Sequence, residues 1–396
     1  MKRIAAIVVC IILGCISSRN ALAYTLKGIV TNAVTHQPVS GVYIYVNQST
    51  YLTITNSAGQ FDLGNITGIE ADLIATKAGF ETLTYHITTQ KIPTQIRFEM
   101  TQLDTARFNG WIGSGSANGK EWFQLFQNFF MGHAAYAAQC EILNSDALKF
   151  KWNDSTQILD VLADGPLMVS NEALGYMLLM NLESFKMNKN GDMVYDGTIA
   201  FKPLHSQSLD IRNKWIENRK QNYPTSQIAF WKSLYNDSLH QNGFTVQFIQ
   251  RIFENESGYA SAVANKKNTT GMQSLKEGNT IVKKKFVDVA ATGAQNLLSN
   301  FLKKNQDNLA VLLASQHIME VKYKKTDAWE PIDRSNGFNP FTSSLAENYS
   351  YIIFSDNPVY IANTGYSFPS SDYWVIGDWN WMGLSTAMPY DYGLKN

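Results

Sequence analysis

The clearest pattern in the first quarter of the chain is an alternation of apolar and polar residues with a period of two. Residues 95–100 read Gln-Ile-Arg-Phe-Glu-Met, and residues 42–47 alternate in a similar way. This period predicts strands with one buried face. Pro38 and Gly41 suit a turn between two such strands, and residues 56–59 suit another. We therefore expect a compact set of short strands before residue 102.

After residue 120 the pattern changes to that of a helix and then returns to strands. Apolar residues from Trp122 to His133 follow the i, i+3, i+4 spacing of one helix face. Turn-forming residues then separate five predicted strands, at 149–152, 158–162, 167–169, 173–187 and 193–201. Helices at 209–221 and 227–241 and a strand at 244–253 follow, and the polar stretch 255–285 is interpreted as an extended loop or an insertion. Strands grouped together and followed by helices favour an α+β domain with an antiparallel meander.

Four short motifs place glycine, proline and aromatic residues at fixed spacing near the N-terminal end. They are Gly28-x-Val30, Thr35-x-x-Pro38-Val39-x-Gly41-Val42, Asn56-x-x-Gly59-x-Phe61-x-Leu63 and Gly79-Phe80. Together they resemble the carboxypeptidase regulatory-like domain, which is a transthyretin-like β-sandwich. The resemblance implies an all-β fold and an exported or surface protein. It implies no catalysis, because function belongs to sites and not to folds.

We therefore expect a multidomain protein with an N-terminal all-β sandwich followed by an α+β domain. The expected parts are a signal peptide at 1–23, the sandwich at 24–102, a linker at 103–120 and the α+β domain at 121–396. The linker is predicted to be flexible because residues 109–119 are rich in glycine and small polar residues.

The predicted α+β domain is similar to a group of uncharacterised exported bacterial proteins that carry the same N-terminal sandwich. The motifs that carry this resemblance are Pro166-Leu167, Asn171-x-Ala173-Leu174-Gly175-Tyr176, Trp215-x-x-x-Asn218-Arg219-x-x-Tyr223, Ser233-Leu234-Tyr235 and Gly243-Phe244. The group implies no assigned activity and no site residues.

The first 23 residues have the three parts of a secretory signal peptide. Lys2 and Arg3 precede an apolar run at 4–16, and Ala21-Leu22-Ala23 ends a short polar region. The apolar run is short for a membrane-spanning helix, which needs about 20 residues. A second interpretation is a lipobox that ends in Cys15, whose lipidated thiol would be the sole membrane anchor. We favour simple cleavage after Ala23, and both interpretations predict export to the periplasm, outer membrane or surface of a Gram-negative bacterium.

Removal of the signal peptide changes both the charge and the cysteine count. It leaves 30 Lys and Arg against 33 Asp and Glu. A net charge near −3 gives no reason to expect nucleic acid as a partner. Cys140 becomes the single cysteine, so stability must come from packing and not from a disulfide framework.

The name of the resembling domain invites a test for zinc carboxypeptidase chemistry. A catalytic zinc needs three protein ligands, which those enzymes supply from His-x-x-Glu and a later histidine. His317 and Glu320 have the spacing of the pair, but no histidine follows them. The chain also lacks the Gly-x-Ser-x-Gly, His-Glu-x-x-His and Gly-x-x-x-x-Gly-Lys motifs. We therefore expect no zinc carboxypeptidase activity and assign no catalytic residue, cofactor or metal ligand.

Aromatic residues are concentrated at the C-terminal end of the chain. Eight lie between Tyr366 and Tyr392, and they include Trp374, Trp379 and Trp381. Exposed tryptophan faces would form a binding surface for a sugar ring or a protein partner. The alternative, which we favour, is that these aromatic residues supply core.

Two functional hypotheses follow from the sequence. The preferred one is an exported binding or scaffold protein without catalytic activity, whose partner is an envelope protein or glycan. The alternative is a hydrolase of envelope glycan or peptide, whose two carboxylates meet only in the folded chain. A pocket that holds two carboxylates would favour the hydrolase.

Overall fold

The computed structural model describes residues 24–66, 70–88, 93, 95–188, 193–265, 269–277, 280–290, 298–314, 317–323 and 349–393, with the backbone alone described at 269–277 and 280–284. The predicted signal peptide and Cys15 lie outside these residues. In the described part of the chain, every helix is too short or too polar to cross a bilayer.

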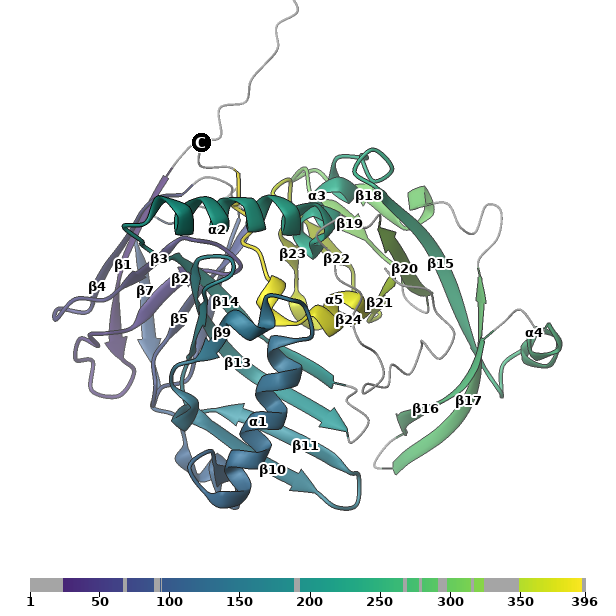
Figure 1. Cartoon of the computed structure of the whole chain (residues 1–396), viewed down its shortest axis with the longest axis horizontal. Coiled ribbons are helices and arrows are strands. Elements are labelled where there is room, and N and C mark those ends of the chain that lie inside the picture. The colour runs from purple at the N-terminus through teal and green to yellow at the C-terminus, as the bar shows by residue number, and fades with distance from the viewer. Residues whose placement is uncertain are drawn as a thin grey trace, which may run out of the picture.

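Two sheets form a β-sandwich at the N-terminal end of the described chain (Figure 1). One sheet has the order β4-β1-β7 and the other the order β3-β2-β5-β6. The strands are β1 (Tyr24–Asn32), β2 (Tyr43–Val46), β3 (Leu52–Ile54), β4 (Gln60–Ile66), β5 (Ala71–Thr76), β6 (Leu83–Ile87) and β7 (Ile96–Met100). Ile96, Phe98 and Met100 are buried, and the two residues between them are exposed. The period-two prediction is therefore confirmed for β7.

Two glycines of the N-terminal motifs have a steric reason to be glycine. A Cβ atom on Gly28 would lie 2.1 Å from the carbonyl oxygen of Ile96, because β7 runs directly beside β1 at this point. Gly59 has a φ of +70°, and a Cβ atom there would lie 2.4 Å from the carbonyl oxygen of Val30. Larger residues at either position would push the strands of the first sheet apart.

A seven-stranded antiparallel sheet follows the sandwich. Its order is β8-β10-β11-β13-β12-β9, and β14 pairs with β13 outside this path. The strands are β8 (Ile112–Gly113), β9 (Cys140–Ile142), β10 (Leu148–Asn153), β11 (Ile158–Ala163), β12 (Leu167–Asn171), β13 (Tyr176–Asn188) and β14 (Met193–Pro203). The antiparallel prediction is confirmed, but the simple meander order is wrong. β13 is long enough to pair with β12 over residues 176–180 and with β11 over residues 185–188.

The described helices are α1 (Ala117–Met131), α2 (Leu209–Asn222), α3 (Gln227–Tyr235), α4 (Tyr259–Ala264) and α5 (Asp378–Met382). The first three differ from the predicted ranges mainly at their ends, and α4 and α5 were not predicted. Short 3-10 helices are η1 (Thr105–Phe108), η2 (Ala137–Gln139), η3 (Ser145–Ala147), η4 (Tyr223–Thr225), η6 (Leu298–Asn300), η8 (Ser370–Asp372) and η9 (Leu384–Thr386). α3 ends six residues before the predicted position 241, because residues 236–243 turn the chain into the next strand.

The predicted flexible linker at 103–120 contains ordered elements. β8 pairs with β10, and α1 begins at Ala117 and not near Trp122. Ser116 caps this helix, because its Oγ accepts a hydrogen bond from the backbone N–H of Gly119. The small polar residues that indicated flexibility therefore include the N-cap of α1.

Two further sheets complete the fold. A six-stranded sheet has the order β16-β17-β15-β20-β21-β24, and a four-stranded sheet has the order β18-β19-β22-β23. Their strands are β15 (Phe244–Phe253), β16 (Thr269–Glu277), β17 (Thr280–Ala290), β18 (Leu302–Lys304), β19 (Ala310–Leu312), β20 (His317–Tyr323), β21 (Tyr349–Phe354), β22 (Val359–Ile361), β23 (Ser367–Phe368) and β24 (Tyr373–Gly377).

The interpretation of residues 255–285 as an extended loop is wrong in large part, whereas the alternative of an insertion stays a prediction. β16 and β17 form a long antiparallel pair that extends the edge of the six-stranded sheet (Figure 1). The lysines at 283–285 interrupt the apolar alternation of β17, so the sequence pattern did not indicate a strand there.

The sandwich packs directly on the seven-stranded sheet. Tyr45 and Ile74, from the second sheet of the sandwich, form a buried cluster with Leu179 and Ala200 of β13 and β14. The hydroxyl groups of Tyr45 and Thr198 are hydrogen-bonded at 2.8 Å in the same layer. The opposite face of the seven-stranded sheet packs in a core that includes α1, and a third core surrounds α3.

The segment after β24 contributes to each of the three main cores. Trp379 packs with α3, Leu384 and Met388 pack with α1, and Tyr390 packs in the core of the sandwich. The Asp391 carboxylate then accepts hydrogen bonds from the backbone N–H and the hydroxyl of Thr50, at 2.9 and 2.5 Å. The C-terminal segment thus ties the sandwich to the rest of the protein.

Candidate functional site

An open pocket of about 690 Å³ lies at the C-terminal end of α3. Its described lining comes from η4, α3, the following loop and the end of β20, and comprises Tyr223, Pro224, Ala229, Lys232, Ser233, Asn236, Gln241, Asn242, Gly243 and Tyr323. The volume lies within the range of small-molecule sites. The described lining offers amides, hydroxyl groups and one ammonium group, and it includes no carboxylate.

The pocket lies where the three main cores meet. Tyr223 packs against the core around α1, the sandwich core and the core around α3. Its ring also contacts the ring of Tyr392, with 5.2 Å between the centroids. Junctions between packed units are common positions for ligand sites, because their walls come from rigid elements.

Hydrogen bonds fix the polar wall of the pocket. The Asn242 amide donates to the hydroxyl groups of Ser233 and Ser238, at 2.9 and 3.1 Å. The Asn236 amide donates to the carbonyl oxygen of Lys232 at 2.9 Å. Gly243 has a φ of +81°, which allows the loop to turn into β15. Both amide hydrogens of Asn242 are engaged, so its Oδ1 is the group that it offers to a ligand.

Lys232 is the cationic group of the pocket. Its side chain is half-buried, and burial alone lowers its pKa below the ordinary value for lysine. None of the ion pairs between described residues includes Lys232. A partly desolvated ammonium group that makes no ion pair with a described carboxylate favours the approach of an anion.

Trp379 supports this pocket from behind. Its ring is stacked on the ring of Tyr323, with centroids 5.6 Å apart and planes 3° apart. Its indole N–H donates to the carbonyl oxygen of Thr225 at 2.7 Å, and the residue is 8% exposed. The structure therefore places Trp379 in the core, as the favoured interpretation of the aromatic segment expected, and removes it from the alternative binding surface. A buried ring stabilises the pocket wall without touching a ligand.

The other two tryptophans of the predicted binding surface have different surroundings. Trp374, on β24, is 44% exposed. Trp381 is partly buried, and its ring is stacked on His133 with 3.9 Å between centroids. The backbone N–H of His133 donates to the carbonyl oxygen of Trp381 at 3.0 Å. Because Trp379 is buried, the three tryptophans do not form one exposed surface.

His317 and Glu320 lie on opposite faces of β20, because they are three positions apart on a strand. The His317 ring lies 5.0 Å from the ring of Phe301. Glu320 is hydrogen-bonded to Tyr351, and burial raises the pKa of its carboxyl group. In the described part of the chain, no three histidine, cysteine or acidic side chains are placed to hold a metal ion together.

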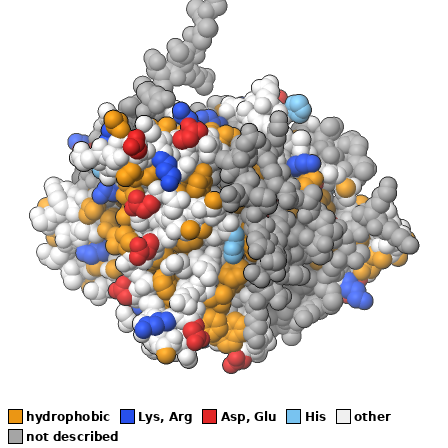
Figure 2. Space-filling view, in the orientation of Figure 1, with side chains coloured by type: hydrophobic (Ala, Val, Ile, Leu, Met, Phe, Trp, Pro, Cys, Tyr) orange, Lys and Arg blue, Asp and Glu red, His pale blue; other side chains and the backbone are white. Residues whose placement is uncertain are grey.

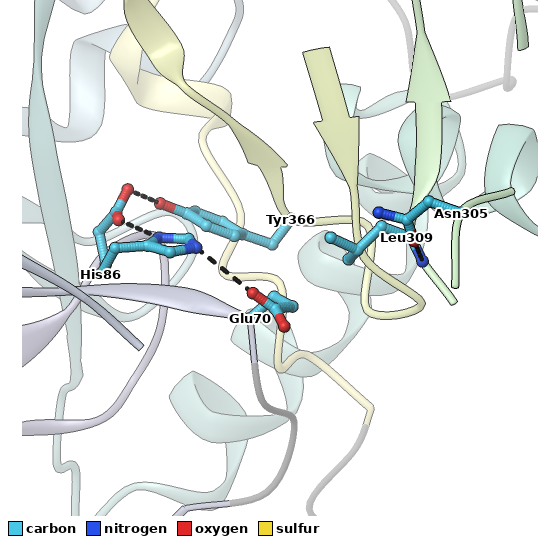
Figure 3. Close-up of polar contacts among 6 residues, drawn as sticks. Glu70, His86, Asn305, Leu309 and Tyr366 are labelled. Carbon is cyan, nitrogen blue, oxygen red and sulfur yellow. Dashed lines mark hydrogen bonds and ion pairs between the residues drawn. The ribbon is translucent and has the colours of Figure 1, made fainter. Parts of the chain in front are cut away.

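A second polar site joins the sandwich to the C-terminal segment (Figure 3). We call it the ionic clasp, and it consists of Glu70, Asp72, His86 and Tyr366. His86 contacts Asp72 through Nδ1 at 2.7 Å and Glu70 through Nε2 at 3.3 Å. The Tyr366 hydroxyl donates to the other carboxylate oxygen of Asp72 at 2.6 Å. Hydrogen bonds with Asp72 and Glu70 raise the pKa of His86 to about 9, so the imidazole is protonated at neutral pH.

The geometry of the ionic clasp suits structure better than catalysis. Its two carboxylates face one cation and one phenol, and the Tyr366 phenol has a pKa well above 10 because it is buried beside Asp72. In the same view, Asn305 accepts a hydrogen bond from the backbone N–H of Leu309, a residue of the sandwich core (Figure 3).

Sequence reasoning did not find the ionic clasp or the pocket. One signal was available for the clasp, because Asp72 and His86 are direct partners on the adjacent strands β5 and β6. Tyr366 gave no such signal, since 294 residues separate it from Asp72. Lys232 also gave no signal, because it lies within the predicted helix 227–241 without a recognisable motif.

Charged side chains are interspersed on the face of the molecule that Figure 2 shows. Lys and Arg alternate there with Asp and Glu among hydrophobic and neutral surface (Figure 2). The described residues of this face therefore form no basic stripe of the kind typical of nucleic-acid binding.

Comparison with known proteins assigns a family to the N-terminal sandwich. Residues 26–106 match the model of the CarboxypepD_reg-like domain, so the chain carries a domain of this family and the N-terminal resemblance is confirmed. No curated protein matches the chain.

One solved structure similar to the chain is described as a "putative membrane-associated protein of unknown function" from Bacteroides fragilis NCTC 9343. The two are 8% identical over 89% of this chain and 93% of that chain, with a TM-score of 0.17. A TM-score this low carries no argument about function.

Proposed function

We propose that this protein is an exported binding protein of the bacterial cell envelope, without catalytic activity, in which the CarboxypepD_reg-like domain supports a ligand pocket in the larger domain. The observation that carries the proposal is the pocket at the end of α3. Its described lining has several polar groups that can bind a ligand and no carboxylate that could act as acid or base.

The acidic pair of the ionic clasp does not supply the missing chemistry. Glu70 and Asp72 are held by His86, and Asp72 also accepts from Tyr366. A glycoside hydrolase typically needs one carboxyl group that can give up a proton and another that stays ionised beside the substrate. The clasp instead places a protonated imidazole between the two carboxylates, so both contact the same cation and neither belongs to the described lining of the pocket.

The supporting role of the sandwich follows from its contacts. It packs on the seven-stranded sheet through Tyr45 and Ile74, and it receives Tyr366 and Tyr390 from the C-terminal segment into its own core. Tyr223, which lines the pocket, touches that same core. The sandwich therefore helps to fix the position of one pocket wall.

Export is the part of the proposal that depends on the N-terminal sequence. Expression of the full-length precursor in a Gram-negative host, followed by fractionation and intact mass, tests it directly. We expect mature protein beginning at Tyr24 in the periplasm or at the cell surface. Lipidated Cys15 would also support export, whereas an uncleaved cytoplasmic chain would contradict it.

Binding is tested with purified mature protein and an envelope fraction that contains both peptidoglycan and outer membrane. Asn236→Trp places a large ring at the exposed rim of the pocket, and Ile216→Trp adds the same ring to the exposed face of α2 as a control. We expect the wild type and the control to be retained by the fraction and the pocket variant to be lost. Release of soluble glycan or peptide by the wild type would instead show a hydrolase.

A further inference from the structure

The half-buried cation of the pocket needs an explanation. Lys232 lies in the last turn of α3, where a positive charge interacts favourably with the helix dipole. That interaction accounts for a lysine at this end, but it does not require the ammonium group to be half-buried in a pocket. None of the ion pairs between described residues compensates this desolvation, and an anionic ligand would do so.

The remaining groups of the pocket indicate what else the ligand carries. Asn242 offers its Oδ1 as an acceptor because its two amide hydrogens are engaged, and Gln241 lies beside it in the lining. Acceptor oxygens suit ligand hydroxyl groups, which donate. Tyr223, which is half-buried, and Pro224, which is exposed, supply apolar surface that suits the C–H face of a sugar ring.

The same groups distinguish a carboxylate from a phosphate. A phosphate group is doubly charged near neutral pH and is best bound by several N–H donors or by arginine. The described lining has a single cation and no arginine. A second negative charge would therefore have no cation of the described lining to face, whereas one carboxylate can be matched by one ammonium group.

We propose that the pocket at the end of α3 binds a sugar that carries a carboxylate, with Lys232 Nζ contacting the carboxylate and the amide oxygens accepting from the sugar hydroxyl groups. This inference rests on the proposed binding function and names its ligand class.

Glucuronate and glucose are a matched pair of probes, because they differ only in a carboxylate or a CH₂OH group at one carbon. Their affinities for purified mature protein are measured by isothermal titration calorimetry or by ligand-observed NMR. We expect glucuronate to bind at least about 10-fold more tightly than glucose, which is about 1.4 kcal/mol. Lys232→Gln should reduce this ratio to less than about 3-fold, while Lys214→Gln, on the exposed surface of α2, should leave it unchanged.

Several results would overturn the inference. Equal affinity for the two sugars, tighter binding of glucose 6-phosphate than of glucuronate, or an unchanged ratio in Lys232→Gln would each do so, provided that circular dichroism shows a folded variant. Absence of binding to both sugars would also overturn it. If the envelope fraction still retained the protein through the pocket, only the ligand class would be wrong, whereas loss of that retention would refute the proposed function separately.

Discussion

The substitution His86→Gln tests whether the ionic clasp holds the sandwich to the C-terminal segment. Glutamine keeps a hydrogen-bond donor near Asp72 but removes the positive charge that faces two carboxylates. The Glu70 side chain is 6% exposed, so it would be left beside Asp72 in a poorly solvated place. Loss of one partner from such a group is destabilising, because the remaining charges are uncompensated.

The size of the effect follows from the pKa of His86. Its rise from 6.5 to about 9 corresponds to roughly 3 kcal/mol if the site were fully buried. The His86 side chain is 36% exposed, so solvent screening reduces the expected contribution to about 1 to 2 kcal/mol. Because the folded-state pKa is raised, this stability is fully present below about pH 6.5 and is lost as the pH rises through about 9.

Urea unfolding at pH 7 and pH 10 measures this contribution. We expect the wild type to lose about 1 to 2 kcal/mol of unfolding free energy between the two pH values and His86→Gln to lose much less. Lys27→Gln is the control and should behave like the wild type. It removes an exposed ion pair between Lys27 and Asp62, whose side chains are 60% and 49% exposed, respectively. If His86→Gln lost as much stability as the wild type over this pH range, the reasoning would be refuted.

Three further predictions concern the packing of the fold. Asp391→Asn should lower the free energy of unfolding, measured in urea, by about 1 to 2 kcal/mol, because it weakens two hydrogen bonds from Thr50. An unchanged free energy would show that packing alone holds the C-terminal segment. Cys140 should react with a thiol reagent at pH 8 only after denaturation, because burial raises its pKa to about 12; rapid reaction of the native protein would contradict this. Trp379→Ala should cost about 3 to 5 kcal/mol in thermal unfolding and Trp379→Phe clearly less, whereas a small effect of both would mean that the ring is not core.

Local pattern predicted those elements whose burial alternates regularly. β7 is the clearest case, because each of its apolar residues faces the core and each charged residue faces solvent. The prediction missed β17 because three lysines interrupt its alternation. The predicted order of β11 and β12 was wrong because both strands pair with the same long strand, β13. Strand order depends on strand length and on contacts distant in sequence, which period alone does not report.

The candidate site was less accessible to sequence reasoning than the fold. Trp379 was noticed because tryptophan is rare, yet its role is to support Tyr323, which the sequence did not distinguish from other tyrosines. The role proposed for Lys232 depends on the lack of an ion pair with a described carboxylate, which can be judged only from the folded structure. Gln241 lies within the predicted helix 227–241, and Asn242 follows it directly. The loop that brings both residues to the end of α3 was therefore not predicted.

The contacts of the C-terminal segment bear on how the CarboxypepD_reg-like domain works in this protein. The family match covers residues 26–106, but the core of that domain includes Tyr366 and Tyr390 from the far end of the chain. Removal of the domain would therefore expose aromatic side chains of the larger domain and also release Tyr223 from one of its three cores. Since Tyr223 lines the pocket, the sandwich and the pocket depend on the same packing, and ligand affinity should fall with any change that loosens the sandwich.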